Sequence, residues 1–264
     1  MRPILFRLGP ITVHSWGFMF MLGILAAILV GRWYLKNRGA DPNGIYGIAI
    51  AAVVGGLIGA RLFYVIGNWS QFAAHPLQLL EFWDLNGLVF YGGLLGGALA
   101  VMLLIRMRRL PFWTFADMVG LVLPLGMAIT RVGCFLNGDS FGKASGLPWA
   151  VTFPEGTRLT MGITALRVHP VQIYELLLDL VLFAFLLFYR KYEKRDGNIF
   201  LLFLIGYSTI RFFMEFLRAH AKADAGPAFQ IMSIAILITA GVVYLLRSRL
   251  AQPLDATNMH AGDR

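Results

Sequence analysis

Residues 170–189 read PVQIYELLLDLVLFAFLLFY, and residues 198–217 read NIFLLFLIGYSTIRFFMEFL. Each run has about the 20 residues that an α-helix needs to cross the hydrocarbon core of a bilayer. The eight residues between them, RKYEKRDG, include four Lys or Arg. Basic residues gather in short cytoplasmic loops of membrane proteins. The pattern therefore predicts two transmembrane helices joined by a cytoplasmic turn.

Five further apolar runs complete the pattern. The sequence thus predicts an all-α integral membrane protein with seven transmembrane helices. No internal repeat or low-complexity linker divides the chain, so we expect residues 1–264 to form a single membrane-embedded domain. The seven spans are expected at roughly 14–35, 45–67, 87–105, 112–136, 170–189, 198–217 and 229–246.

Composition supports a bilayer as the solvent of this chain. The mean hydropathy is +0.69, and only 14% of residues are charged, against roughly 25% in soluble domains. The net charge of +9 is explained by basic loops, so no nucleic-acid partner is expected. The single cysteine, Cys134, excludes an intramolecular disulfide framework and a Cys-rich metal site. No metal or other cofactor is predicted.

The distribution of Lys and Arg predicts how the chain is oriented. The loops after the first, third, fifth and seventh spans carry more Lys and Arg than the opposite side, which predicts a cytoplasmic C-terminus and an N-terminus outside. The non-apolar segment 137–169 then lies outside, as a small extracytoplasmic cap. Within it, LPWAVTF (147–153) is expected to form a short strand, and PEG (154–156) a turn.

Several charged residues lie within or at the ends of the predicted spans. A charge at the bilayer centre costs at least about 2.5 kcal/mol, so such residues usually face a bundle interior or a wet cavity. For Asp117 and Asp179 a structural ion pair is the favoured interpretation. With the predicted orientation, five others belong to one layer near the outer leaflet: Arg61, Arg131, Arg211, Arg218 and Glu175.

Few carboxylates are expected in that layer, and an anionic phospholipid is the simplest complement to its arginines. Arg211, Glu215 and Arg218 are spaced for one helical face, so Glu215 is predicted to hold both arginines. Arg131 precedes a glycine-rich helix end, where Gly133, Gly138 and Gly142 would allow close approach of backbone to a ligand, and Asn137 would offer its amide.

His169 precedes Pro170 at the predicted start of the fifth span. A histidine in this position is interpreted either as a general base or phosphate donor, or simply as a polar residue at a helix entrance.

The segment RVGCFLNGDSFG (131–142) resembles the signature of prolipoprotein diacylglyceryl transferases. Five other segments resemble further parts of the same family, in the family's order and spacing. They are HSWGFMF (14–20), GARLFYV (59–65), FYGGLLGG (90–97), RVHPVQIYE (167–175) and GYSTIRFFMEFLR (206–218). The resemblance implies a bacterial inner-membrane enzyme with seven helices. Its activity would be transfer of the diacylglyceryl group of phosphatidylglycerol to the lipobox cysteine of a prolipoprotein, with release of glycerol phosphate.

The resemblance also implies roles for individual residues. Arg131 corresponds to the phospholipid-binding arginine, Arg211 to a second essential arginine with Glu215 as its companion, and Gly142 to an important signature glycine. The chain departs from the family at four positions, where Trp16, Tyr91, Cys134 and Asp139 stand for a common Tyr, His, Asn and Glu.

The family histidine has been proposed as a catalytic base, and Tyr91 with an ordinary pKa near 10 is a poor base. We therefore expect Tyr91 to hydrogen-bond the phosphate or the thiol, with His169 as the alternative base. Cys134 is predicted to be a packing residue. Two other interpretations stay open at this point: a membrane transporter, whose charges would line a path across the bilayer, and a catalytically inactive lipid-binding relative.

Overall fold

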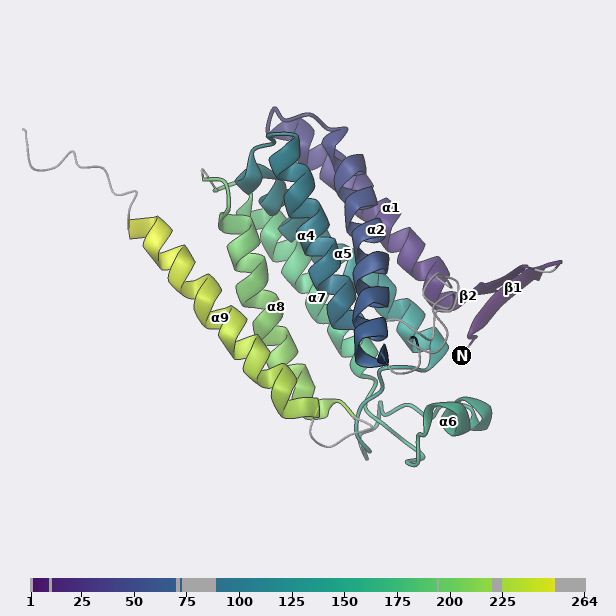
Figure 1. The fold of residues 1–264 in the computed structure, drawn as a ribbon. Helices are drawn as coiled ribbons and strands as arrows, with labels where there is room; N and C mark the ends of the chain where they lie inside the picture. Colours follow the sequence, from purple (N-terminus) through teal and green to yellow (C-terminus); the bar gives the residue numbers. More distant parts are fainter. Residues whose placement is uncertain are drawn as a thin grey trace, which may run out of the picture. The chain divides into compact units, whose positions relative to one another are not determined.

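The computed structural model describes residues 2–9, 11–69, 72, 89–193, 195–219 and 225–249, and helices dominate this part of the chain (Figure 1). Six of the described helices are long and apolar enough to cross a membrane, and the apolar helix Tyr91–Met107 is shorter. The elements group into two compact units: residues 1–26 with 119–264, here called the first unit, and residues 27–118, the second unit. Each is described by itself.

The described helices match the predicted spans, with ends that differ by at most four residues. The prediction of an integral, mainly helical membrane protein is confirmed. The start of the expected third span, residues 87–88, lies outside the described residues, as do Lys194, Lys222 and Arg264, which contributed to the predicted orientation. The long helices are α1 (Ser15–Asn37), α2 (Gly44–Gly67), α4 (Phe90–Met107), α5 (Phe112–Asn137), α7 (Val171–Tyr189), α8 (Asn198–Leu217) and α9 (Ala225–Arg249).

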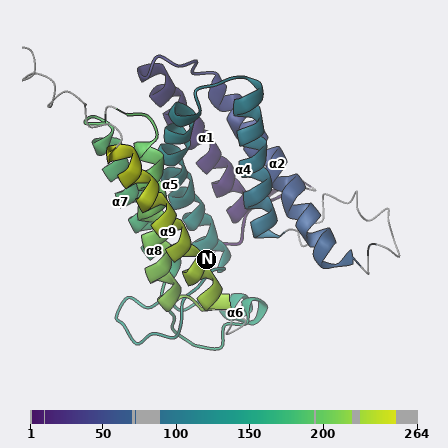
Figure 2. The same ribbon diagram turned by 60° about the vertical axis from the view of Figure 1, so that its left-hand side comes forward.

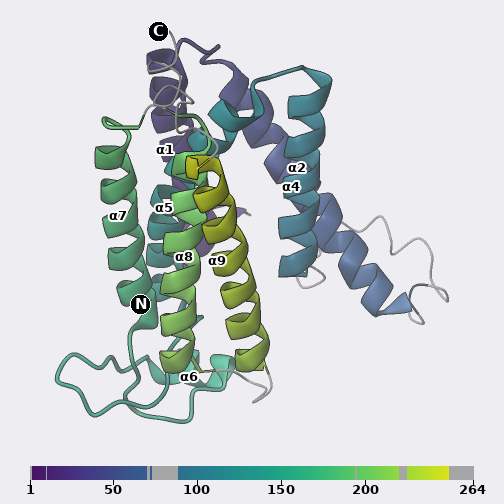
Figure 3. The same ribbon diagram turned by 90° about the vertical axis from the view of Figure 1, so that its left-hand side faces the viewer.

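Glycines let α2 and α4 approach closely in the second unit, where the two helices run side by side (Figures 2 and 3). A Cβ added at Gly96 of α4 would lie 2.8 Å from the Cα of Gly59 in α2, and Gly55 of α2 faces the same part of α4. Small residues at helix crossings give this close backbone packing in membranes. Many of the glycines in the sequence therefore serve helix packing.

In the first unit, α8 packs against α7 and α9 (Figure 3). Glycines again set the contacts: a Cβ at Gly120 of α5 would lie 2.8 Å from the Cα of Phe200 in α8, and one at Gly206 of α8 would lie 2.6 Å from Leu182 of α7. The membrane-spanning part of α9 is only 11% buried. This helix therefore meets the rest of the first unit mainly along α8.

The segment between α5 and α7 has a small apolar core of its own, made by Phe153, Ile163 and Val168. The expected strand at 147–153 is wrong: only Val151 pairs, in an isolated bridge with Val168. The expected turn at 154–156 is also wrong beyond its first residue, because the short helix α6 (Glu155–Met161) follows Pro154. Packing of these three apolar side chains outweighed the alternating pattern of the local sequence.

An N-terminal hairpin precedes α1 and was not predicted. Its strands β1 (Ile4–Leu8) and β2 (Ile11–His14) pair in antiparallel register across Gly9, whose φ is +58°. The Ser15 amide donates to the Pro3 carbonyl at 2.9 Å, which ties β1 to the first residue of α1. The strands are too short for hydropathy alone to reveal them.

Candidate functional site

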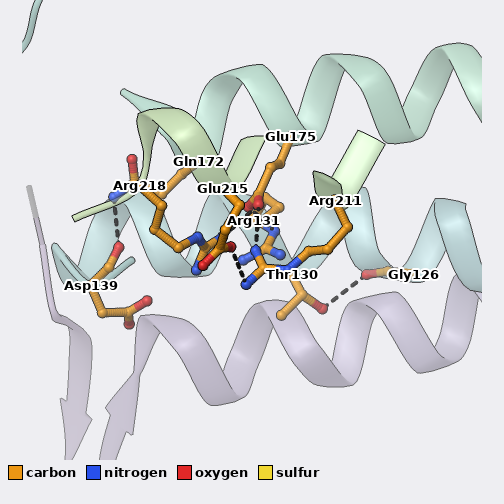
Figure 4. A network of polar contacts seen from close by, with 9 residues as sticks. All are labelled: Gly126, Thr130, Arg131, Asp139, Gln172, Glu175, Arg211, Glu215 and Arg218. Carbon is orange, nitrogen blue, oxygen red and sulfur yellow. Dashed lines mark hydrogen bonds and ion pairs between the residues drawn. The ribbon is translucent and has the colours of Figure 1, made fainter. Parts of the chain in front are cut away.

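Charged side chains from three helices of the first unit lie together where α5 and α8 end and α7 begins (Figure 4). Arg131 lies in the last two turns of α5, Arg211 and Glu215 in the last two turns of α8, and Arg218 directly after α8. Glu175 lies in the second turn of α7, which starts where the other two end. Because α7 runs antiparallel to its neighbours, its beginning meets their ends.

Glu175 is the centre of this cluster. Its carboxylate forms an ion pair with Arg131, 2.8 Å from Nε. It also accepts hydrogen bonds from Arg211 Nη1 at 3.3 Å and from Arg218 Nη2 at 2.5 Å. Its side chain is only 4% exposed, whereas those of the three arginines are 12–18% exposed. The carboxylate is thus more deeply buried than the three arginines around it.

Glu215 pairs with Arg211 at 2.9 Å, one helical turn away. The expectation that Glu215 would hold Arg218 as well is corrected by the observed pair between Arg218 and Glu175. The side chain of Arg218 leaves the end of α8 toward α7, where the carboxylate of Glu175 is within reach.

The charge of the cluster is smaller than the sequence suggested. Three guanidinium groups face two carboxylates, so these five side chains keep one formal positive charge. Burial lowers the pKa of Arg218, and the negative charge of Glu175 offsets only part of that effect. The arginine nevertheless stays protonated, as arginines do in proteins. A surplus of one positive charge in a partly accessible site suits a singly charged anion such as a phosphodiester.

Backbone hydrogen bonds hold the three helix ends in register. On one side the segment 141–143 exchanges two hydrogen bonds with His169, both 3.0 Å long. On the other it accepts from the Ala219 amide at 3.2 Å and donates to the Leu217 carbonyl at 2.8 Å. The segment after α5 is therefore fixed between the start of α7 and the end of α8.

The glycines near Arg131 are explained by these protein contacts. A Cβ at Gly142 would lie 2.6 Å from the His169 Cβ and 2.8 Å from its carbonyl oxygen. Gly138 has φ +87° and faces Thr157 and Phe153. Close approach to a ligand, which the sequence suggested for both, is not needed to explain them, and their substrate contact stays a prediction.

Asn137 and Asp139 form the turn after α5. The Asn137 amide donates to the Asp139 carboxylate at 2.8 Å, and the fully buried Gln172 of α7 donates to the Asp139 carbonyl at 2.6 Å. These bonds attach the turn to the first residues of α7, three residues before Glu175. Their role is visible in the geometry of the turn, while a contact with substrate stays a prediction.

His169 belongs to a second, smaller network at the start of α7. Trp149 donates its indole N–H to the Tyr174 hydroxyl at 2.7 Å, and that hydroxyl lies 3.5 Å from His169 Nδ1. Both His169 and Tyr174 are within six residues of Glu175 along the chain. The sequence gave no indication of Trp149, because 25 residues separate it from its partner Tyr174.

Other predicted site residues lie in the second unit or at the start of α1. Arg61 is buried in the second unit, with its guanidinium 5.7 and 5.4 Å from the ring centroids of Tyr64 and Phe72. Tyr91 lies in the first turn of α4, in the same unit. Their roles at the arginine cluster stay predictions. Trp16, at the start of α1, is exposed and stacks on Phe20.

Two aromatic residues next to Arg211 were missed by the sequence analysis. Tyr207 precedes Arg211 by one turn of α8, and its spacing with Arg211 and Glu215 could have revealed it. Phe229 of α9 lies under the guanidinium of Arg211, with 5.1 Å from Cζ to the ring centroid. No local spacing predicts that contact, because it joins two different helices.

These helices define an integral membrane protein, and the cluster gathers three arginines around a buried carboxylate where α5 and α8 end. The chain belongs to the prolipoprotein diacylglyceryl transferase family: the family model of that description matches residues 3–247. The predicted family membership is confirmed.

Relatives named phosphatidylglycerol–prolipoprotein diacylglyceryl transferase match most of the chain. The protein from Symbiobacterium thermophilum is 34% identical over 256 residues, which cover 96% of this chain and 95% of that protein. The one from Bordetella avium is 36% identical over 222 residues, covering 82% and 81%. The one from Nostoc sp. is 34% identical over 222 residues, covering 82% and 78%.

Proposed function

We propose that this chain transfers the diacylglyceryl group of phosphatidylglycerol to the lipobox cysteine of a prolipoprotein, forming a thioether and releasing glycerol phosphate. The observation that carries the proposal is the convergence of Arg131, Arg211 and Arg218 on the buried Glu175. The enzyme name of the relatives, which match the chain over most of its length, supports the same proposal.

Glu175 prepares the arginines for a phosphate. It restrains each guanidinium through one edge, and the partly exposed arginines have further N–H donors. Guanidinium groups match phosphate oxygens bidentately. The lipid phosphate binds to these donors without the arginines having to find their positions first, which reduces the entropic cost of binding.

The chemistry is an alkyl transfer. The cysteine sulfur attacks the glyceryl carbon that bears the phosphate, the C–O bond breaks with its electron pair staying on oxygen, and a C–S bond forms. The released phosphate or water takes up the proton of the thiol. Because the P–O bonds stay intact, the protein must stabilise negative charge growing on the leaving phosphate, and Arg131 and Arg211 supply that stabilisation.

The thiol needs little help from a strong base. Free cysteine has a pKa near 8.5, and neighbouring cationic groups lower it. In this proposal the arginine cluster favours the thiolate, Tyr91 hydrogen-bonds the phosphate or thiol, and His169 is the alternative base. Cys134 is buried in α5 and has a packing role; the reacting thiol belongs to the prolipoprotein.

The proposal includes a location. Seven spans, an extracytoplasmic N-terminus and a cytoplasmic C-terminus would put the ends of α5 and α8 near the outer leaflet of the bacterial inner membrane. The arginine cluster would then lie at the depth of the outer headgroups, below a cap formed by residues 137–169. The single-domain organisation predicted from the sequence is part of this proposal.

The test uses the purified chain in nanodiscs that contain phosphatidylglycerol, with a lipobox peptide as acceptor. We expect a thioether-linked diacylglyceryl peptide and one glycerol phosphate for each peptide modified. A peptide with Ser in place of the lipobox cysteine is the control and should not react. Binding of phosphatidylglycerol without product would instead identify an inactive lipid-binding relative, and movement of a solute across the membrane would favour a transporter.

A further inference from the structure

Within the part of the chain that the structure describes, Arg211 is the arginine of the cluster that lies over an aromatic ring. The edges of its guanidinium pair with Glu175 at 3.3 Å and with Glu215 at 2.9 Å. Its Cζ lies 5.1 Å from the centroid of the Phe229 ring. The guanidinium is thereby held along its edges by two carboxylates and lies over the face of an aromatic ring, which restrains its position.

We propose that Phe229 is a positioning residue for the transfer reaction, acting on Arg211 through a cation–π contact. The inference rests on the proposed function and assigns part of the site to α9. A ring face attracts a cation most strongly where both are removed from water. Arg211 is largely removed from water, with its side chain only 15% exposed, and Phe229 is half-buried.

The structure of α9 supports this assignment. Ser233 is buried, and its hydroxyl donates to the Phe229 carbonyl at 2.9 Å, within the helix turn that carries the ring. At the other end of α9, Arg247 donates to the Asp196 carbonyl at 2.7 Å, and the Tyr244 hydroxyl lies 3.3 Å from that of Tyr189. The helix is therefore attached to the rest of the first unit near both ends, although its membrane-spanning part is only 11% buried.

A mere packing role for Phe229 predicts a different result from a cation–π role. Packing depends on the volume of the side chain, whereas the attraction of a cation depends on the negative charge of the ring face. Ring fluorines withdraw that charge and change the volume little. A series with one, two and three fluorines at position 229 separates the two explanations.

The experiment measures kcat/KM for phosphatidylglycerol with a lipobox peptide, in nanodiscs, for the wild type, the fluorinated series, Phe229→Trp and Phe229→Leu. We expect kcat/KM to fall stepwise with each fluorine, and Phe229→Leu to lose roughly threefold to thirtyfold. Phe229→Trp should keep the activity. Phe213→Leu, an exposed phenylalanine of α8, is the matched control and should leave kcat/KM unchanged.

Equal kcat/KM across the fluorinated series would overturn the inference, even if Phe229→Leu is inactive, because the ring would then act by its volume alone. A wild type that yields no thioether would refute the proposed function instead. In that case the affinity of the same variants for phosphatidylglycerol decides the inference, because a correctly placed Arg211 binds the phosphate more tightly: affinity should follow ring charge, and an unchanged affinity would overturn it.

Discussion

Replacing Glu175 with glutamine removes the common partner of three arginines while keeping the volume of the side chain. The carboxylate is 4% exposed and lies 2.5 to 3.3 Å from three guanidinium nitrogens. Breaking a buried ion pair by neutralising one partner costs about 3–5 kcal/mol. We therefore expect Glu175→Gln to lower the free energy of unfolding by an amount in that range, in nanodiscs of phosphatidylcholine.

Phosphatidylglycerol should restore part of that loss. In the variant the five-residue cluster carries two formal positive charges instead of one. We expect this added attraction for the phosphate to outweigh the loss of the carboxylate that positions the arginines. We expect the variant to bind phosphatidylglycerol at least about tenfold more tightly than the wild type, which corresponds to about 1.4 kcal/mol. The difference in stability between the two proteins should then narrow by a similar amount in nanodiscs of phosphatidylglycerol.

Thermal unfolding in the two lipids, with binding of phosphatidylglycerol measured alongside, tests this expectation. The control is Glu155→Gln, which makes the same chemical change at an exposed position of α6. It should change neither stability nor lipid affinity. If phosphatidylglycerol stabilises Glu175→Gln no more than it stabilises the wild type, the cluster does not bind the lipid phosphate and the reasoning is refuted.

Five further substitutions test other parts of the argument. Arg131→Ala should lower kcat by roughly 100-fold to 1000-fold, the usual effect of removing one donor to a developing negative charge, and undiminished turnover in the peptide assay would contradict its role. Tyr91→Phe should reduce kcat/KM, and His169→Ala should keep some activity. If Tyr91→Phe is fully active and His169→Ala is inactive, the role proposed for Tyr91 is wrong and His169 is the base. Gly142→Ala should unfold at a lower temperature than the wild type, because its Cβ would lie 2.6 Å from that of His169, and an unchanged melting curve would contradict this packing. Cys134→Ala should still form thioether at a rate near that of the wild type, and its complete inactivity would show that the buried thiol has a part in the reaction.

Hydropathy predicted the membrane helices well because each span depends mainly on its own residues. The end of α5 at Asn137 and the charge-bearing face of α8 could likewise be read from local spacing. Contacts that join distant segments could not. Nothing within α8 indicates that Arg218 pairs with Glu175 rather than with Glu215, since this choice depends on where α7 begins beside it.

The glycines show a second limit of the sequence. A glycine beside an arginine is compatible with close approach of a ligand, of a helix or of a neighbouring loop. In the structure Gly133 faces the backbone of Trp16 at the start of α1, and Gly142 faces His169. Only the packing of neighbouring elements distinguishes these possibilities, and the same holds for the short helix α6.

The partners within the arginine cluster also bear on how the chain enters a membrane during synthesis. Arg211 and Glu215 are one turn apart on α8, so this helix can be inserted with its own charges paired. Arg131 of α5 and Glu175 of α7 form a second neutral pair, which is complete before α8 has been made. Arg218 lies just beyond the end of α8. The surplus positive charge therefore arises only when Arg218 joins the cluster, and α8 does not have to carry it unpaired through the hydrocarbon core, where insertion of a charge is costly.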